Sequence, residues 1–267
     1  MLLKDHNFQK IGTPALALMF VGLCFMAQCA RQTGSEYIIR ADHSRVGISI
    51  DGLLDEPAWQ TAGPVMLKEN RSGHTIDNDR ISTRVMTCYD DSTLYIAFVC
   101  NDPDIWTTYR QRDEHLWKEE AVEVFIEADE MPDTYVEIEV SPANVLFDSY
   151  IIDPQNIDIP ATAAFDLPGI RTAVSIAGTL NVRDDIDNSW NVEIAVPFRD
   201  LATERIKQVS TATAIKINFY RLEKSRGMES AGHAWSPTGA RFHTPSAFGR
   251  LIFNSPARPE KSHFRGG

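Results

Sequence analysis

Two tryptophans lie in polar segments, where a large flat ring has few apolar neighbours to pack against. Trp117 lies in residues 115–120, and Trp235 lies in residues 233–239, which also contain turn residues. A ring in such a loop can stack on the apolar face of a sugar ring. This placement predicts a binding site for a flat ligand. The competing interpretation is that both rings pack in the core with their indole N–H groups hydrogen-bonded.

Sugar binding also requires planar polar side chains that bond pairs of hydroxyl groups. Such side chains lie in segments that alternate polar and apolar residues, at Glu123, Glu137, Arg84, Asn218 and Arg221. Stacking would contribute on the order of 1 kcal/mol per ring, and a hydrogen bond to a charged group about 1.5–3 kcal/mol. For the two arginines and the asparagine, the competing interpretation is a surface or structural role.

Short β-rich runs separated by turn signals must position these residues, because no helical period of useful length is present. Their spacing predicts an all-β fold, namely an antiparallel β-sandwich of the immunoglobulin or jelly-roll type with Greek-key connections. One short helix is expected over residues 55–62, with Trp59 pointing into the core. The expected strands are residues 37–40, 46–50, 82–89, 94–100, 121–128, 134–140, 145–151, 171–176, 190–196, 214–221 and 249–253.

Two of the expected strands carry carboxylates on one face. Glu123 and Glu127 alternate with apolar residues in one strand, and Glu137 and Glu139 do so in the next. Strand geometry puts these side chains on the face opposite the core. Neighbouring strands of this kind would form a polar floor for a ligand, and a plain solvated face is the alternative.

Length, charge and cysteines limit the classes of function. The chain has 267 residues and a net charge of −11, which fits one large β domain over residues 36–254. An acidic chain of this kind is not expected to bind nucleic acid or an anionic membrane surface. Cys88 and Cys100 flank a turn at residues 90–93, at an offset beyond disulfide reach. We therefore expect two buried free thiols.

Residues 1–29 have the pattern of an export signal. Lys4 and Lys10 lie at its start, and the apolar run that follows is shorter than a membrane span. Cys29 follows a segment similar to a bacterial lipoprotein cleavage site, so its lipidation is one outcome and plain cleavage near Ala27 or Ala30 is the other. The expected location is periplasmic, outer-membrane-anchored or secreted, with membrane contact only through a lipid anchor. The tail, residues 255–267, is expected to be disordered.

Five motifs follow one another between residues 48 and 253. They are Ile50-Asp51-Gly52 with Asp55-Glu56 and Trp59, Tyr89-Asp90-Asp91 with Leu94-Tyr95-Ile96-Ala97, Trp117 with Glu120-Ala121-Val122-Glu123, Trp190 with Glu193 and Val196-Pro197-Phe198, and Trp235-Ser236-Pro237 with His243, Pro245 and Phe248-Gly249. In this order the motifs resemble those of carbohydrate-binding module family 9 and its DOMON-like relatives.

The resemblance implies a non-catalytic β-sandwich that binds mono- or oligosaccharides or the ends of polysaccharide chains. It implies that Trp117 and Trp235 clamp one sugar between them and that Glu123 bonds the sugar hydroxyls. It also implies a role in polysaccharide breakdown, alongside glycoside hydrolases. A family-implied calcium ion would find oxygen ligands near Asp51, Asp55 and Asp102.

Other classes of function stay open. The scattered histidines and the lack of Gly-x-Ser-x-Gly, His-Glu-x-x-His and phosphate-loop motifs argue against an enzyme, although a hydrolytic pair of carboxylates is compatible with the sequence. One alternative is a haem-binding electron-transfer protein of the DOMON-like type, with ligands drawn from Met66, Met86, His74 and His115. Another is a surface lipoprotein that mediates protein contacts.

Overall fold

The computed structural model describes residues 37–128, 131, 133–201, 209, 211–212 and 214–256. The predicted export signal with Cys29, and all but two residues of the predicted tail, lie outside these ranges. The strands are β1 (Ile38–His43), β2 (Val65–Met66), β3 (Lys68–Glu69), β4 (Thr83–Tyr89), β5 (Thr93–Asn101), β6 (Ala121–Glu127), β7 (Tyr135–Val140), β8 (Leu146–Ile151), β9 (Arg171–Ala177), β10 (Ser189–Pro197), β11 (Ile215–Glu223), β12 (Ala231–Ala234) and β13 (Gly249–Phe253).

Five short helices interrupt these strands. They are α1 (Pro57–Thr61), α2 (Ile159–Thr162) and the 3₁₀ turns η1 (Asp79–Ile81), η2 (Leu116–Lys118) and η3 (Pro245–Ala247). Within the described residues, no helix has the length and apolar character needed to span a membrane. The described part of the chain is mostly β, as the sequence predicted.

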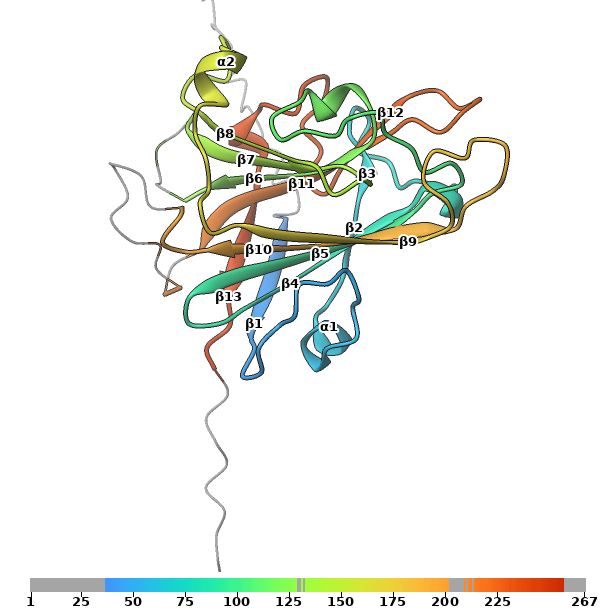
Figure 1. Cartoon of the computed structure of the whole chain (residues 1–267). Coiled ribbons are helices and arrows are strands. Elements are labelled where there is room, and N and C mark those ends of the chain that lie inside the picture. The colour runs from blue at the N-terminus through green and yellow to red at the C-terminus, as the bar shows by residue number, and fades with distance from the viewer. Residues whose placement is uncertain are drawn as a thin grey trace, which may run out of the picture. The chain divides into compact units, whose positions relative to one another are not determined.

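Strand β1 gives the fold a pairing pattern that the sequence analysis did not predict. Hydrogen-bonded strands follow the order β8-β7-β6-β11-β13-β1-β4-β5-β10-β9, as can be followed in Figure 1. The first four residues of β1 pair with β13 and its last two pair with β4, in both cases parallel. One strand thus passes between two antiparallel halves and joins them into a single mixed sheet. The expected purely antiparallel sandwich was wrong in this respect, and the expected strand at residues 46–50 is not formed.

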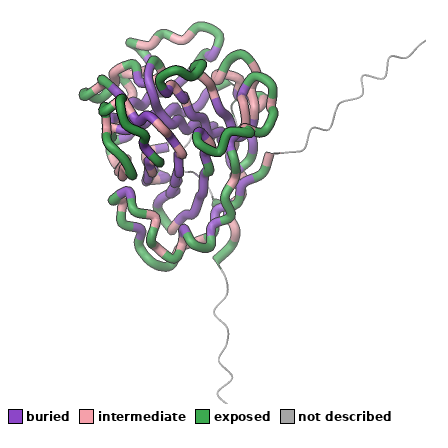
Figure 2. Tube along the Cα trace, turned by 90° about the vertical axis from the view of Figure 1, so that its right-hand side faces the viewer, coloured by how far each residue is buried: buried purple, intermediate pink, exposed green. Residues whose placement is uncertain are grey.

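The core lies between the two halves of this sheet. Alternate residues of β6 and β7, such as Val124 and Ile138, share one apolar cluster with Ile96 of β5 and Ile194 of β10. Figure 2 shows the buried strands surrounded by exposed loops. Burial of one face of each strand explains why the alternation in the sequence predicted most of these strands correctly.

Two smaller predictions are confirmed. Trp59 of α1 is 3% exposed, and its indole N–H donates to Glu193 at 2.9 Å, so this tryptophan is structural. Cys88 and Cys100 are buried and free. Burial raises the pKa of the Cys88 thiol to about 12, which keeps it protonated and unreactive at neutral pH.

Trp235 packs against the backbone of β13 as a core residue. It is 4% exposed, and its ring lies edge-on to Tyr37 and tilted against Phe219. The ring covers Gly249, where an added Cβ would overlap its six-membered part and lie 2.8 Å from the carbonyl oxygen of Tyr37. The position therefore requires glycine because of close approach.

Replacing Gly249 by alanine should lower the free energy of unfolding by about 2–3 kcal/mol, because the Trp235 ring has to move out of a packed core. Gly47→Ala is the matched control, since an added Cβ there meets nothing within 4 Å, and its effect should stay within about 0.5 kcal/mol. Urea unfolding of the three proteins measures both values. Equal stabilities for the two variants would contradict this account of Trp235.

An aromatic cluster lies on the outer face of β6, β7 and β11, away from the core. Phe125 stacks on Tyr135 and also on His243, whose Nδ1 lies 2.6 Å from the Tyr135 hydroxyl. Burial, followed by the nearby charge of Arg241, lowers the pKa of His243 to about 4. The neutral imidazole is therefore the form that the fold accommodates.

This histidine should make the protein less stable in weak acid. The folded pKa lies below the unfolded value of about 6.5, so the unfolded chain binds the extra proton as the pH falls from 6.5 towards 4. The stabilisation is complete above pH 6.5, and on the order of 1–2 kcal/mol should be lost between pH 7 and pH 5. Unfolding free energies of wild type and His243→Gln at both pH values test this. Parallel pH profiles for the two proteins would refute it.

Candidate functional site

The outer face of β6, β7 and β8 is covered by loops rather than solvated. The connection from β5 to β6 places Tyr109, Leu116 and Trp117 over one part of it, where they pack with Phe147. The segments after β8 and β12 cover another part, where Ile157 and Phe242 pack with the aromatic cluster of β6 and β7. The long loops therefore turn this face into a second interior.

Three carboxylates lie between these two covered regions. Glu123 of β6 stands directly opposite Glu139 of β7, and Glu137 lies one pleat further along β7. Oxygen atoms of the three side chains lie within 4.8 Å of one another, and the residues are 2%, 1% and 5% exposed respectively. The predicted polar floor therefore exists, and the alternative of a solvated face is wrong.

The three carboxylates have few partners. Glu137 accepts a hydrogen bond from the Ser149 hydroxyl at 3.0 Å, and Glu139 accepts one from the backbone N–H of Trp117. One oxygen of Glu139 has no hydrogen-bond partner, and Glu123 forms no hydrogen bond with any described residue. Lys224 is the neighbouring cation, but its Nζ donates to the carbonyl of Trp117 at 3.2 Å instead.

Burial changes the ionisation of this cluster. Desolvation and the charge of Glu137 raise the pKa of Glu123 well above its usual range. Desolvation and the two neighbouring charges have the same effect on the pKa of Glu139. Desolvation raises the pKa of Glu137 to about 7. Three negative charges this close together and out of water repel one another, so both burial and proximity favour the protonated forms of these carboxyl groups.

Trp117 lies at the edge of this carboxylate cluster and is partly exposed. Its ring contacts Phe147 edge-on, and Phe147 stands opposite Glu139 in the sheet. His115 stacks on the ring with centroids 4.5 Å apart. An accessible aromatic pair thus borders three hydrogen-bond acceptors, an arrangement that can bind a ligand with both an apolar face and hydroxyl groups.

Other residues predicted for the site lie elsewhere. The buried ring of Trp235 offers no face to a ligand, so the expected pair of stacking tryptophans is reduced to Trp117 in this structure. Asn218 is fully buried and bonds the backbone N–H and C=O of Ser236, which is a structural role. Arg84 is exposed on β4, in the other half of the sheet.

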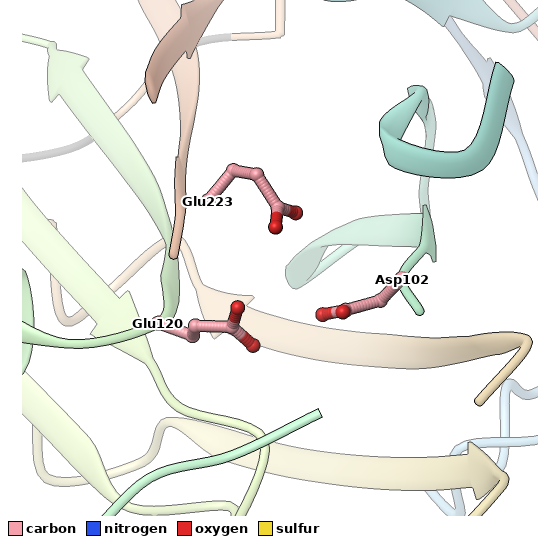
Figure 3. Close-up of side chains that lie close together, drawn as sticks. All are labelled: Asp102, Glu120 and Glu223. Carbon is pink, nitrogen blue, oxygen red and sulfur yellow. The ribbon is translucent and has the colours of Figure 1, made fainter. Parts of the chain in front are cut away.

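Arg221 lies in a second buried cluster, on the core side of β11. Its guanidinium donates to Asp102 at 2.9 Å and also to Glu223, and all three residues are fully buried. Figure 3 shows the carboxylates of Asp102, Glu120 and Glu223 pointing toward one another, from the ends of β5 and β11 and the start of β6. Arg221 is therefore held in a fully buried, ion-paired position away from the outer face.

This second cluster also holds excess negative charge. Burial and the charge of Asp102 raise the pKa of Glu120 well above its usual range, which favours its protonated form. Trp190 donates to Asp102 at 3.0 Å, and the backbone N–H of Lys224 donates to Glu120 at 3.2 Å. Arg221 supplies the cation around which these acceptors are arranged.

The residues named for calcium and haem do not come together in a site. Asp51 and Asp55 are exposed, and neither belongs to the two carboxylate clusters of the described residues. Asp102 belongs to the cluster that Arg221 fills. For haem, Met86 is buried beside Trp59 and Tyr95, whereas Met66 is 50% exposed and His115 stacks on Trp117.

Sequence reasoning missed Glu139 as a member of the site. The alternation put it on the correct face, but only strand register places it opposite Glu123. It also missed that Glu120 and Arg221 share a cluster, because they are about 100 residues apart and no local pattern links them.

Comparisons with known proteins identify a family that the chain resembles. A model of the family described as carbohydrate family 9 binding domain-like matches residues 50–255. An extracellular protein of Arthroderma benhamiae is 27% identical over 187 residues, which is 64% of this chain and 78% of that protein.

Solved structures share the fold at low sequence identity. A protein of Bacteroides uniformis assigned as carbohydrate-binding is 17% identical with a TM-score of 0.64, over 82% of this chain and 100% of its own. A family 9 module of Caldicellulosiruptor kristjanssonii in complex with cellotriose is 14% identical with a TM-score of 0.58. The match covers 86% of this chain and 99% of that module. The family model covers most of the described chain and these relatives share its fold, so the chain belongs to the carbohydrate family 9 binding domain-like family.

Proposed function

We propose that the protein binds carbohydrate at the edge of the outer face of β6 and β7. The observation that carries this proposal is the placement of Trp117, partly exposed, beside three carboxylates of which Glu123 has no hydrogen-bond partner among the described residues. Family membership supports the ligand class, and one similar module was solved in complex with glucose. Stacking on an indole and bonding of hydroxyls by carboxylates together recognise a sugar.

In this proposal the roles of the residues differ from those in a clamp of two tryptophans. Trp117 and His115 present the aromatic surface, and Glu123 and Glu139 accept hydrogen bonds from sugar hydroxyls. Trp235 supports the fold by packing against Gly249 of β13. A ligand that enters from the edge fits the end of an oligosaccharide or polysaccharide chain better than its middle, because loops cover the rest of the face.

The cellular role is part of the same proposal. We infer export from the N-terminal segment, and the similarity to an extracellular protein supports it. A lipid anchor at Cys29 would hold the protein at a bacterial surface, where binding of chain ends would serve polysaccharide breakdown. Membership of the wider DOMON-like superfamily belongs to this proposal as well.

Trp117→Ala should weaken the binding of cellotriose or glucose at least about tenfold, because loss of the stacking surface removes roughly 1.4 kcal/mol or more. Isothermal titration calorimetry measures the affinity directly and does not depend on tryptophan as a reporter. Trp235→Phe is the matched control. It should lower the melting temperature and leave the affinity of the folded protein within about twofold.

Two results would overturn the proposal. One is an absence of binding by wild type to mono- and oligosaccharides across a glycan array. The other is unchanged affinity in Trp117→Ala together with lost affinity in a folded Trp235→Phe protein. That result would mean that the sugar binds at Trp235 instead of Trp117.

A further inference from the structure

The two buried carboxylate clusters differ in one respect that affects ligand binding. Each contains three acidic side chains whose oxygens lie within 4.8 Å of one another. In the cluster of Asp102, Glu120 and Glu223, the Arg221 guanidinium supplies the positive charge. In the cluster of Glu123, Glu137 and Glu139, no Lys, Arg or His nitrogen of the described residues lies within 4.0 Å of a carboxylate oxygen.

The cluster of Glu123, Glu137 and Glu139 also has a buried oxygen without a hydrogen-bond partner. Glu123 is 2% exposed and forms no hydrogen bond with any described residue. One oxygen of Glu139, which is 1% exposed, is likewise without a partner. A buried carboxylate oxygen without a donor destabilises the fold, because it has lost its hydration without gaining a partner. Oxygen atoms of Glu123, Glu137 and Glu139 lie within 4.8 Å of one another, so one cation between them would supply the partner that Glu139 lacks.

We propose that Glu123, Glu137 and Glu139 bind one hard divalent cation of the Ca²⁺ class. The donor set consists of carboxylate oxygens, with the Ser149 hydroxyl 3.0 Å from Glu137. Oxygen-only sites of this kind suit Ca²⁺, and the lack of sulfur or imidazole in the cluster disfavours zinc and copper. Two oxygens that bind one Ca²⁺ lie at most about 5 Å apart, so side chains whose oxygens all lie within 4.8 Å of one another can share one ion.

Charge balance favours a divalent ion over a monovalent one. Three carboxylates carry up to three negative charges. With one Ca²⁺ bound, the net charge of the site is −1 when all three are ionised, which is close to neutrality. Coordination also removes the repulsion between Glu123 and Glu139, which stand directly opposite each other across two strands. This site differs from the position near Asp51, Asp55 and Asp102 that the sequence suggested for calcium.

Terbium binding to the protein tests this site, and no sugar is needed. Tb³⁺ replaces Ca²⁺ in oxygen sites, and excitation of Trp117, whose backbone N–H bonds Glu139, should sensitise its luminescence. The full chain is treated with EDTA, desalted and titrated with Tb³⁺, and CaCl₂ is then added as competitor. Calorimetry with CaCl₂ alone gives the stoichiometry, and a thermal melt gives the stability with and without the ion.

The number of Ca²⁺ ions bound per chain should be higher by one in wild type than in the double variant Glu123→Gln/Glu139→Gln. Calcium should raise the melting temperature of wild type by roughly 5 °C and leave that of the double variant unchanged. Glu120→Gln is the matched control, because it alters one acid of the cluster that Arg221 fills, and it should bind Tb³⁺ and Ca²⁺ as wild type does.

Folding of the double variant does not limit the test. Glutamine has nearly the same shape as glutamate but no charge, so the two substitutions remove charge repulsion without changing the packing. In EDTA the melting temperature of the double variant should therefore equal or exceed that of wild type. Should it fail to fold, the single variant Glu137→Gln takes its place. Equal stoichiometry in wild type and either folded variant, or a wild type that binds neither Tb³⁺ nor Ca²⁺, overturns the proposal. Failure of sugar binding alone leaves it intact, since the metal is measured without sugar.

Discussion

The buried guanidinium of Arg221 fixes the part of the molecule on which the candidate site depends. It bonds Asp102 and Glu223 and also the backbone carbonyl of Asn101, so it ties the end of β5 to the end of β11. Glu120 joins the same cluster three residues after Trp117 and three before Glu123. Because breaking a buried ion pair from one side typically costs 3–5 kcal/mol, this cluster holds the start of β6 and the ring beside it in one place.

Local sequence patterns predicted most strands of this fold because alternate residues of each strand are apolar and face the core. Alternation in β6 and β7 also put Glu123, Glu137 and Glu139 on one common face. The parallel pairing of β1 was not predictable, since residues 38–43 show no local sign that their first part joins β13 and their last part joins β4. The same holds for the loops over the outer face, whose contacts join residues far apart in sequence.

The candidate site could be predicted in part for the same reason. Trp117 and Glu123 are six residues apart in sequence, so the chain itself keeps them near each other, and both belong to the candidate site. Trp235 was misread because polar neighbours in sequence do not imply polar neighbours in space. Its environment is made by Tyr37, Phe219 and the bare backbone of Gly249, and a glycine below a ring is visible only once strands are paired.

The cation and the sugar would meet at the same carboxylates, and this makes the two proposals mutually consistent. A carboxylate has two oxygens, so Glu123 can hold an ion with one and accept a sugar hydroxyl with the other. A calcium ion with three protein side chains retains open coordination positions, since it takes six to eight oxygen ligands, and hydroxyl oxygens are suitable occupants. If the sugar binds to the calcium ion in this way, calcium must change the affinity for the sugar, and the sugar must change the affinity for calcium by the same factor. Protons on the cluster would then compete with both, because a protonated carboxyl binds a cation poorly and donates where a hydroxyl needs an acceptor.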